Sequence, residues 1–150
     1  MTMTTATAPA AVSTIYIRAT PEVIWRALTD PELTMRYHGA LFETDWAPGS
    51  AFRTYRDGTL DVEGVIVEVD PPHRLVHTFH ARWNADTEAD PPSRVTWEIE
   101  ETRPGICRVT IIHDRLVAGS ATARIVTRGG PKILSGLKTL LETGTDLGLL

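Results

Sequence analysis

The spacing of apolar and polar positions changes several times along this 150-residue chain. Residues 12–18 alternate with a period of two, which predicts a first strand. Two short helical segments follow, and each opens with a capping residue and a proline, Thr20 with Pro21 and Asp30 with Pro31. A capping oxygen followed by proline is typical of helix starts, because proline lacks an N–H that would have no partner there. The chain therefore begins as strand, helix, helix.

Most of the remaining chain is typical of short strands. The predicted strands are residues 41–44, 50–56, 60–70, 74–83, 94–100 and 107–114. Pairs such as Pro48-Gly49, Asp57-Gly58 and Pro104-Gly105 separate them, and such short connections favour antiparallel hairpins. Residues 84–92 are expected to form the longest irregular loop. The inward face of 60–70 stays open, because alternate valines compete with Ile66 and Gly64 indicates a bulge.

Alternation along these strands predicts which side chains point into the protein. The inward sets are Ile15 and Ile17; Leu75, His77, Phe79, Ala81 and Trp83; Val95, Trp97 and Ile99; and Val109, Ile111 and His113. We expect these sets to form one face of a sheet, with Arg74, His80 and Arg82 on the opposite, outer face.

The C-terminal region carries the period of a long helix. Pro131 is predicted to open this helix and Gly144 to end it, with Leu134, Leu137 and Leu140 on its apolar face. Residues 120–127 are expected to form a separate helical turn with two buried side chains, Ile125 and Val126. One sheet and one covering helix make an α+β domain.

Four segments also resemble a known family in their amino-acid sequence. They are residues 19–33 (ATPEVIWRALTDPEL), 69–76 (VDPPHRLV), 93–97 (SRVTW) and 137–144 (LKTLLETG). Together they resemble the activator of heat-shock protein 90 ATPase-like family, within the START-like (SRPBCC) superfamily. The resemblance implies a helix-grip fold, in which a curved antiparallel sheet of about six to seven strands wraps a long C-terminal helix and leaves a deep apolar pocket. Residues 12–150 would form this single domain, and residues 1–11 a disordered tail.

The chain departs from this family at two places. It has Gly129-Gly130 where relatives usually carry Gly-Trp, and Tyr37-His38 where a pair of aromatic residues is often found. If these positions correspond, the loss of a large side chain at the pocket mouth would widen the pocket.

Charge and cysteine content exclude several classes of protein. Fifteen basic and nineteen acidic residues give a net charge of −4 without a basic run, which argues against nucleic-acid and membrane-surface binding. A single cysteine, Cys107, excludes an internal disulfide and favours a cytoplasmic location. We expect a monomer or homodimer.

The five histidines do not have the spacing of a metal site. His77 and His80 point to opposite faces of one strand, and zinc requires three or four converging ligands. His77 and His113 instead lie among inward apolar residues. Each is interpreted in three ways: a structural histidine with a satisfied hydrogen bond, a group that orients an apolar ligand, or an acid-base catalyst with a shifted pKa.

The leading hypothesis is binding of a small hydrophobic molecule between the sheet and the last helix, without a metal or organic cofactor. The expected ligand-binding residues are Phe52, Tyr55, His77, Phe79, Trp83, Trp97, His113 and Leu137. The second hypothesis is a cofactor-free cyclase, dehydratase or hydrolase with His77 or His113 as general base and Tyr55 as acid. The third is a module that regulates a chaperone or binds another protein through the outer face of the sheet.

Overall fold

A computed structural model describes residues 6–149 of the chain. Its strands are β1 (Ala11–Ile17), β2 (Leu41–Thr44), β3 (Ala51–Arg56), β4 (Thr59–Asp70), β5 (Arg74–Ala81), β6 (Ser93–Arg103) and β7 (Ile106–Asp114). Its helices are α1 (Pro21–Thr29), α2 (Pro31–Tyr37), α3 (Ala85–Ala89) and α4 (Ala121–Thr143).

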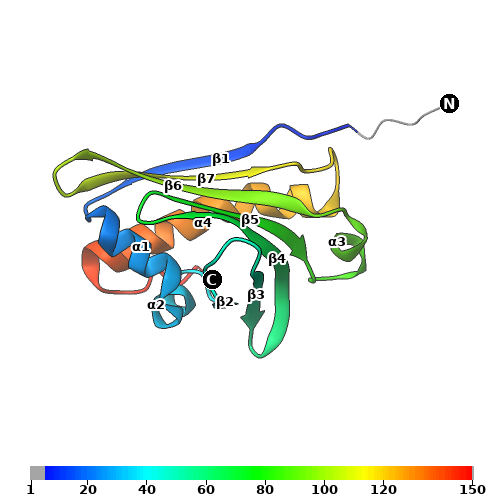
Figure 1. Ribbon diagram of the computed structural model, residues 1–150, viewed down its shortest axis with the longest axis horizontal. Helices are drawn as coiled ribbons and strands as arrows, with labels where there is room; N and C mark the ends of the chain where they lie inside the picture. The colour runs from blue at the N-terminus through cyan, green and yellow to red at the C-terminus, as the bar shows by residue number, and fades with distance from the viewer. Residues whose placement is uncertain (1–5, 150) are drawn as a thin grey trace.

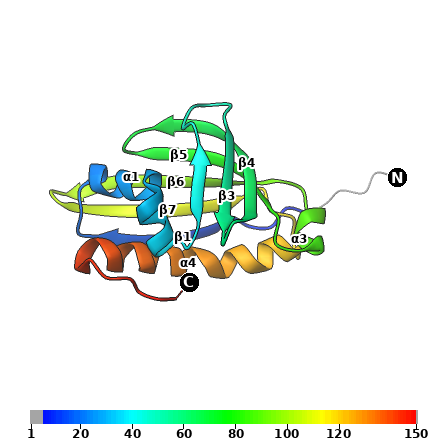
Figure 2. The same ribbon diagram turned by 90° about the horizontal axis from the view of Figure 1, so that it is seen from below.

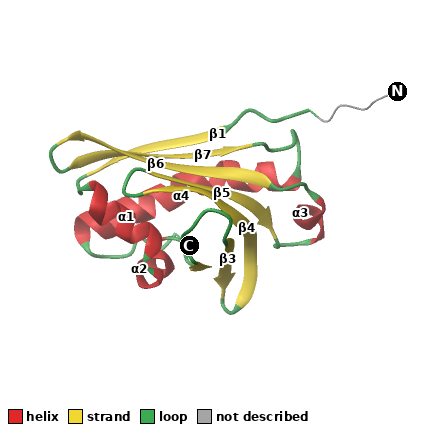
Figure 3. Ribbon diagram, viewed as in Figure 1, coloured by secondary structure: helices red, strands yellow, loops and turns green. Residues whose placement is uncertain are grey.

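The seven strands form one antiparallel sheet in the order β1-β7-β6-β5-β4-β3-β2. The sheet is strongly curved, so that β3 and β4 turn away from the direction of β1, β6 and β7 (Figure 1). The long α4 runs beside β1 on the concave side of this curve (Figure 2). Helices α1 and α2 lie at one end of the sheet and α3 at the other (Figure 3). The predicted α+β helix-grip architecture is confirmed.

Local sequence explains where the two short helices begin. Thr20 Oγ1 accepts a hydrogen bond from the Val23 amide at 3.3 Å, and Asp30 Oδ1 accepts one from the Glu32 amide at 3.0 Å. Pro21 and Pro31 occupy the first helical positions, as predicted. Asp30 ends α1 and caps α2, so the two helices meet at a sharp corner.

The prediction for the last helix is wrong at its start. Helix α4 begins at Ala121, ten residues before Pro131, and Pro131 lies inside it. Ser120 makes this earlier start possible, because its Oγ accepts a hydrogen bond from the Ala123 amide at 3.1 Å. Ile125 is 43% exposed rather than buried, and Val126 is only half-buried. The predicted end is confirmed, because Gly144 caps the helix in the left-handed conformation.

The structure resolves the inward face of β4. Val62 and Ile66 are buried while Val65 and Val67 are exposed, and the register against β5 shifts between Ile66 and Glu68. The sequence indicated a bulge at Gly64, but the irregularity between β4 and β5 lies two to four residues further along the chain. Gly64 has a different role: a Cβ atom there would lie 2.0 Å from the Thr78 carbonyl oxygen of β5.

The expected irregular loop of residues 84–92 contains the short helix α3. Asn84 Oδ1 accepts from the Thr87 amide at 3.0 Å, and Thr87 Oγ1 accepts from the Asn84 amide at 3.2 Å. This reciprocal capping box stabilises a single turn that hydrophobic periodicity does not reveal.

Within the predicted tail, residues 1–5 lie outside the described residues. Thr7 pairs with Val117 in an isolated bridge, and β1 begins at Ala11. None of the helices within residues 6–149 combines the length and apolar character that crossing a bilayer requires.

Candidate ligand-binding site

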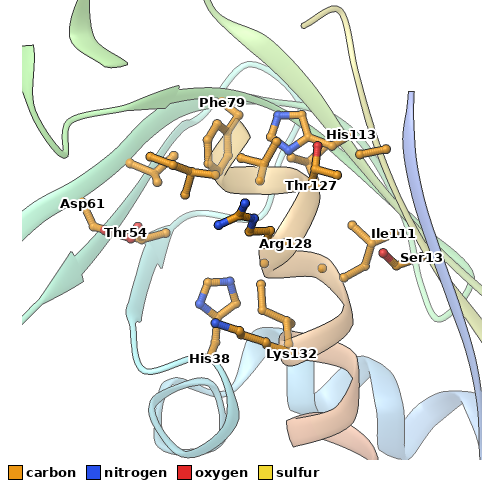
Figure 4. A pocket seen from close by; sticks show the side chains of 18 of the residues that line it. Ser13, His38, Thr54, Asp61, Phe79, Ile111, His113, Thr127, Arg128 and Lys132 are labelled. Carbon is orange, nitrogen blue, oxygen red and sulfur yellow. Dashed lines mark hydrogen bonds between the residues drawn. The ribbon is translucent and has the colours of Figure 1, made fainter. Parts of the chain in front are cut away.

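The concave face of the sheet and the N-terminal half of α4 enclose a cavity of about 920 Å³. This volume lies near the upper end of the roughly 300–1,000 Å³ that is common for small-molecule sites. Most of its exposed wall is apolar, and Phe52, Phe79, Val95, Trp97 and Ile111 are among the aromatic and aliphatic residues that form it. Figure 4 shows the side chains around this space, with α4 along one side.

The structure brings six of the eight expected site residues to this cavity. They are Phe52, His77, Phe79, Trp83, Trp97 and His113. Their rings also pack on one another: Phe52 stacks on His77 with centroids 4.0 Å apart, and Phe79 meets His113 edge-on at 4.6 Å. Contact between these side chains and a ligand stays a prediction.

Tyr55 and Leu137 are not among the cavity-lining residues. Phe52, Thr54 and Arg56 line the cavity with a period of two along β3, so plain alternation places Tyr55 on the other face of the strand. Leu137 is fully buried in the apolar core, on the C-terminal half of α4. The prediction of Tyr55 did not follow the alternation that starts from Phe52. Leu137 was predicted from helical periodicity, which does not show where along a helix packing becomes complete.

His77 presents one ring nitrogen whose hydrogen-bonding role is fixed. Its Nδ1 donates to the Thr78 carbonyl at 2.8 Å, so Nδ1 carries the proton. Burial lowers the pKa of His77 to about 4, although this hydrogen bond opposes the shift. The neutral ring therefore leaves Nε2 as an acceptor, and within residues 6–149 this nitrogen makes no hydrogen bond.

His113 is held in a similar way by a different partner. Its Nε2 lies 2.6 Å from Ser93 Oγ, and the Ser93 hydroxyl donates to the Phe79 carbonyl at 3.4 Å. The tautomer of His113 decides which atom donates in the Ser93–Nε2 hydrogen bond, and Nδ1 makes no hydrogen bond within residues 6–149. Burial lowers the pKa of His113 to about 4; His77 adds to this shift and Asp114 opposes it.

A buried carboxylate organises another part of the wall. Asp61 is 6% exposed and accepts hydrogen bonds from Thr54 Oγ1 at 3.0 Å and Trp83 Nε1 at 2.7 Å. Arg56 Nε lies 3.3 Å from Asp61 Oδ1. The carboxylate is therefore compensated within the protein, as a buried charge requires.

His38 contributes a third histidine ring, beside Arg56. Its Nδ1 lies 3.4 Å from Arg56 Nη2, and its ring meets Phe42 edge-on with centroids 5.1 Å apart. Burial, with the Arg56 charge as a second cause, lowers the pKa of His38 to about 4. The described residues contain no group of three side chains placed to hold a metal ion.

Comparison with protein families gives one match over most of the chain. Residues 18–142 match the model described as "Activator of Hsp90 ATPase homolog 1-like protein". The chain belongs to this family. A search of curated proteins finds no significant match.

Solved structures share the architecture of this Activator of Hsp90 ATPase homolog 1-like chain. Protein MLL2253 from Mesorhizobium loti aligns with a TM-score of 0.77 at 25% identity, over 93% of this chain and 100% of that one. CalU16 from Micromonospora echinospora gives 0.73 at 19% identity, over 92% and 77%. The Aha1 dimer from Colwellia psychrerythraea gives 0.74 at 16% identity, over 91% and 98%. The two more distant likenesses show the fold alone.

Gly129 and Gly130 lie on α4 and line the cavity. A Cβ atom at Gly130 would lie 2.6 Å from Ser13 Oγ, so the missing side chain lets α4 approach β1. Gly129 lines the cavity, and a Cβ atom there would meet nothing within 4 Å.

Several polar residues of the wall were not predicted from the sequence: Arg56, Asp61, His38, Arg128 and Lys132. Arg56 carried a usable signal, because it continues the period of two from Phe52 through Thr54. Asp61 required knowledge of the irregularity in β4, where this residue has no partner in β3. Arg128 and Lys132 carried a usable signal, because with Arg124 they recur every four residues. The prediction did not use this spacing, because it placed the start of the helix at Pro131.

Proposed function

We propose that the protein binds a small, largely apolar molecule in the cavity between the sheet and α4. The observation that carries this proposal is the cavity of about 920 Å³ itself, with its aromatic wall and two histidine ring nitrogens that have no partner within residues 6–149. A ligand hydroxyl or amine that donates to His77 Nε2, or that forms a hydrogen bond with His113 Nδ1, would satisfy these nitrogens, and apolar surface would fill the rest.

The same geometry favours binding over general-base catalysis. A base that works near neutral pH is most effective with a pKa near 7, whereas the pKa values of His77 and His113 are lowered to about 4. Ser93 contacts His113, but Ser93 is 3% exposed and is not a cavity-lining residue. We therefore assign the histidines to ligand orientation.

The family match supports a second proposal, that the protein binds a chaperone or forms a homodimer, since one similar structure is an Aha1 dimer. The charged residues on the outer face of the sheet give little support to this second proposal. Arg74 pairs with Glu68 and Glu98, and Arg82 pairs with Glu63, so these arginines are neutralised within the chain. The lone buried thiol of Cys107 supports a reducing, cytoplasmic setting for either function.

A neutral fluorescent probe tests ligand binding directly. N-phenyl-1-naphthylamine is apolar, carries one N–H donor, and fluoresces strongly when it leaves water. Ile111→Trp places a large ring in the cavity, and Ile112→Trp adds the same ring at the next position of β7, which does not line the cavity.

We expect wild type and Ile112→Trp to bind the probe within twofold of each other, and Ile111→Trp to bind at least about tenfold more weakly. Circular dichroism of both variants checks that they fold. Equal binding by all three proteins, or no binding by any, would refute the proposal.

A further inference from the structure

The cavity carries a charge imbalance that its apolar wall does not explain. Five charged side chains line it, and four are cations: Arg56, Arg124, Arg128 and Lys132, against the single carboxylate of Asp61. The whole chain, in contrast, has a net charge of −4. Positive charge is therefore concentrated at this site within an acidic protein.

Three of these cations form one row on α4. Arg124, Arg128 and Lys132 are spaced four residues apart, so they follow one another along the same face of the helix. Figure 4 shows Arg128 pointing from α4 into the cavity and Lys132 near His38. All three are exposed, which places their charges where the cavity meets solvent.

No ion pair within residues 6–149 neutralises this row. Elsewhere on the described surface, arginines such as Arg53, Arg74, Arg82 and Arg108 each lie within 4.0 Å of a carboxylate. Across the cavity, Arg56 is held by Asp61, whose oxygens are already used. The α4 row thus has charge available for a ligand.

Deeper in the cavity the polarity is different. His77 and His113 are neutral near pH 7, and their neighbours are Phe52 and Phe79. The site therefore changes from a neutral aromatic interior to a cationic rim. A ligand that matches both regions has an apolar body and one acidic group at its end.

We propose that the ligand is an amphipathic organic acid, whose anionic group binds Arg124, Arg128 and Lys132 while its apolar part fills the interior. This inference rests on the proposed ligand-binding function and specifies its ligand class. Arginine guanidinium groups pair with carboxylates and similar oxyanions through two parallel hydrogen bonds, and lysine adds a third charge.

Two dyes with the same ring system separate charge from apolar contact. 8-Anilinonaphthalene-1-sulfonate carries a permanent anionic group, and N-phenyl-1-naphthylamine lacks it. The test variant is Arg128→Gln with Lys132→Gln. The matched control, Arg18→Gln with Arg103→Gln, removes the same charge from exposed positions that do not line the cavity.

We expect wild type to bind the sulfonate at least about tenfold more tightly than the neutral dye at low salt. The test variant should lose about tenfold in sulfonate affinity and stay within twofold for the neutral dye, whereas the control stays within twofold for both. Salt at about 0.5 M should weaken only the sulfonate, because exposed charges are then screened. Decanoate should displace the sulfonate better than decan-1-ol.

Three results would overturn this inference. Equal affinity for both dyes, unchanged in the test variant, would leave an apolar site without acid selectivity and would not affect the proposed function. Equal losses in the test and control variants would show only general attraction to the protein surface. Failure of both dyes to bind would refute the acidic ligand and the proposed function together.

Discussion

The two halves of α4 face the same curved sheet but build opposite interiors. In the C-terminal half, Leu134, Leu137 and Leu140 are at most 5% exposed and pack in one core with Ile17 and Ile24. In the N-terminal half, residues 123–130 line the cavity. These eight residues include two glycines, an alanine, a threonine and two arginines, which lack the apolar volume to fill the space.

The contrast shows that the cavity is a property of this half-helix and not of the fold alone. A fold of this kind supplies concavity, and side-chain volume decides whether the concavity is filled. The filled end should therefore determine stability, and the hollow end ligand binding and sensitivity to pH.

The largest expected effect is acid destabilisation of the hollow end. Unfolded histidine has a pKa near 6.5, while the pKa values of His77 and His113 are lowered to about 4 in the folded protein. As pH falls, the unfolded chain gains protons first, so stability is complete above about pH 7 and is lost between pH 6.5 and 4. Each histidine should remove about 2 kcal/mol between pH 7 and pH 5.

Urea unfolding at these two pH values measures the loss, and His77→Gln with His113→Gln is the comparison. Glu63, Asp114 and Glu142 also have lowered pKa values, but unfolded carboxylates titrate mostly below pH 5 and contribute little in this interval. The double variant should keep only the part of the stability loss that is due to His38. An identical pH dependence in both proteins would contradict the assignment.

A cavity-forming substitution at the filled end should have the next largest effect. Leu137→Ala removes a fully buried side chain and should cost about 3 kcal/mol of unfolding free energy. Val126→Ala, on the hollow half, should cost less than about 1 kcal/mol, because that side chain is only half-buried. Denaturant titration measures both. Similar costs at the two positions would remove the distinction between the halves.

The Asp61 cluster should contribute a smaller amount to the hollow end. Asp61→Ala leaves Trp83 Nε1 without its acceptor and Arg56 without its ion pair, at a cost of about 2 kcal/mol. The control Glu68→Ala breaks the exposed pair with Arg74 and should cost under about 1 kcal/mol. Denaturant titration with tryptophan fluorescence compares them. Equal costs would mean that Asp61 is no more important than a surface carboxylate.

Much of the filled end could be predicted from the sequence, because local rules act there without competition. Thr20 and Asp30 cap helices as expected, and alternation placed Leu75, Ile99 and Val109 on the inward face. Long apolar periods and proline-started helices agree with the tertiary packing, so the α+β fold followed from them.

At the hollow end, predictions failed where contacts between distant parts of the sequence determine the structure. The register shift between β3 and β4 leaves Asp61 of β4 without a partner residue in β3, and only the pairing of these two strands reveals it. Proline inside α4 contradicted the local rule that proline opens a helix, because the earlier cap at Ser120 and contact with β1 stabilise residues 121–130. These deviations occur beside the cavity, where local preference and final structure most often disagree.

The smallest expected effect compares two neighbouring glycines of the hollow half. Gly129→Ala adds a methyl group that meets nothing within 4 Å, and it should stabilise the helix by up to about 1 kcal/mol because alanine loses less backbone entropy. Gly130→Ala places the same methyl 2.6 Å from Ser13 Oγ, and the displacement of Ser13 should cancel that gain. Thermal unfolding of the two variants measures the difference. Equal gains would show that α4 can move away from β1 at no cost, and that the close approach at Gly130 does not fix the width of the cavity.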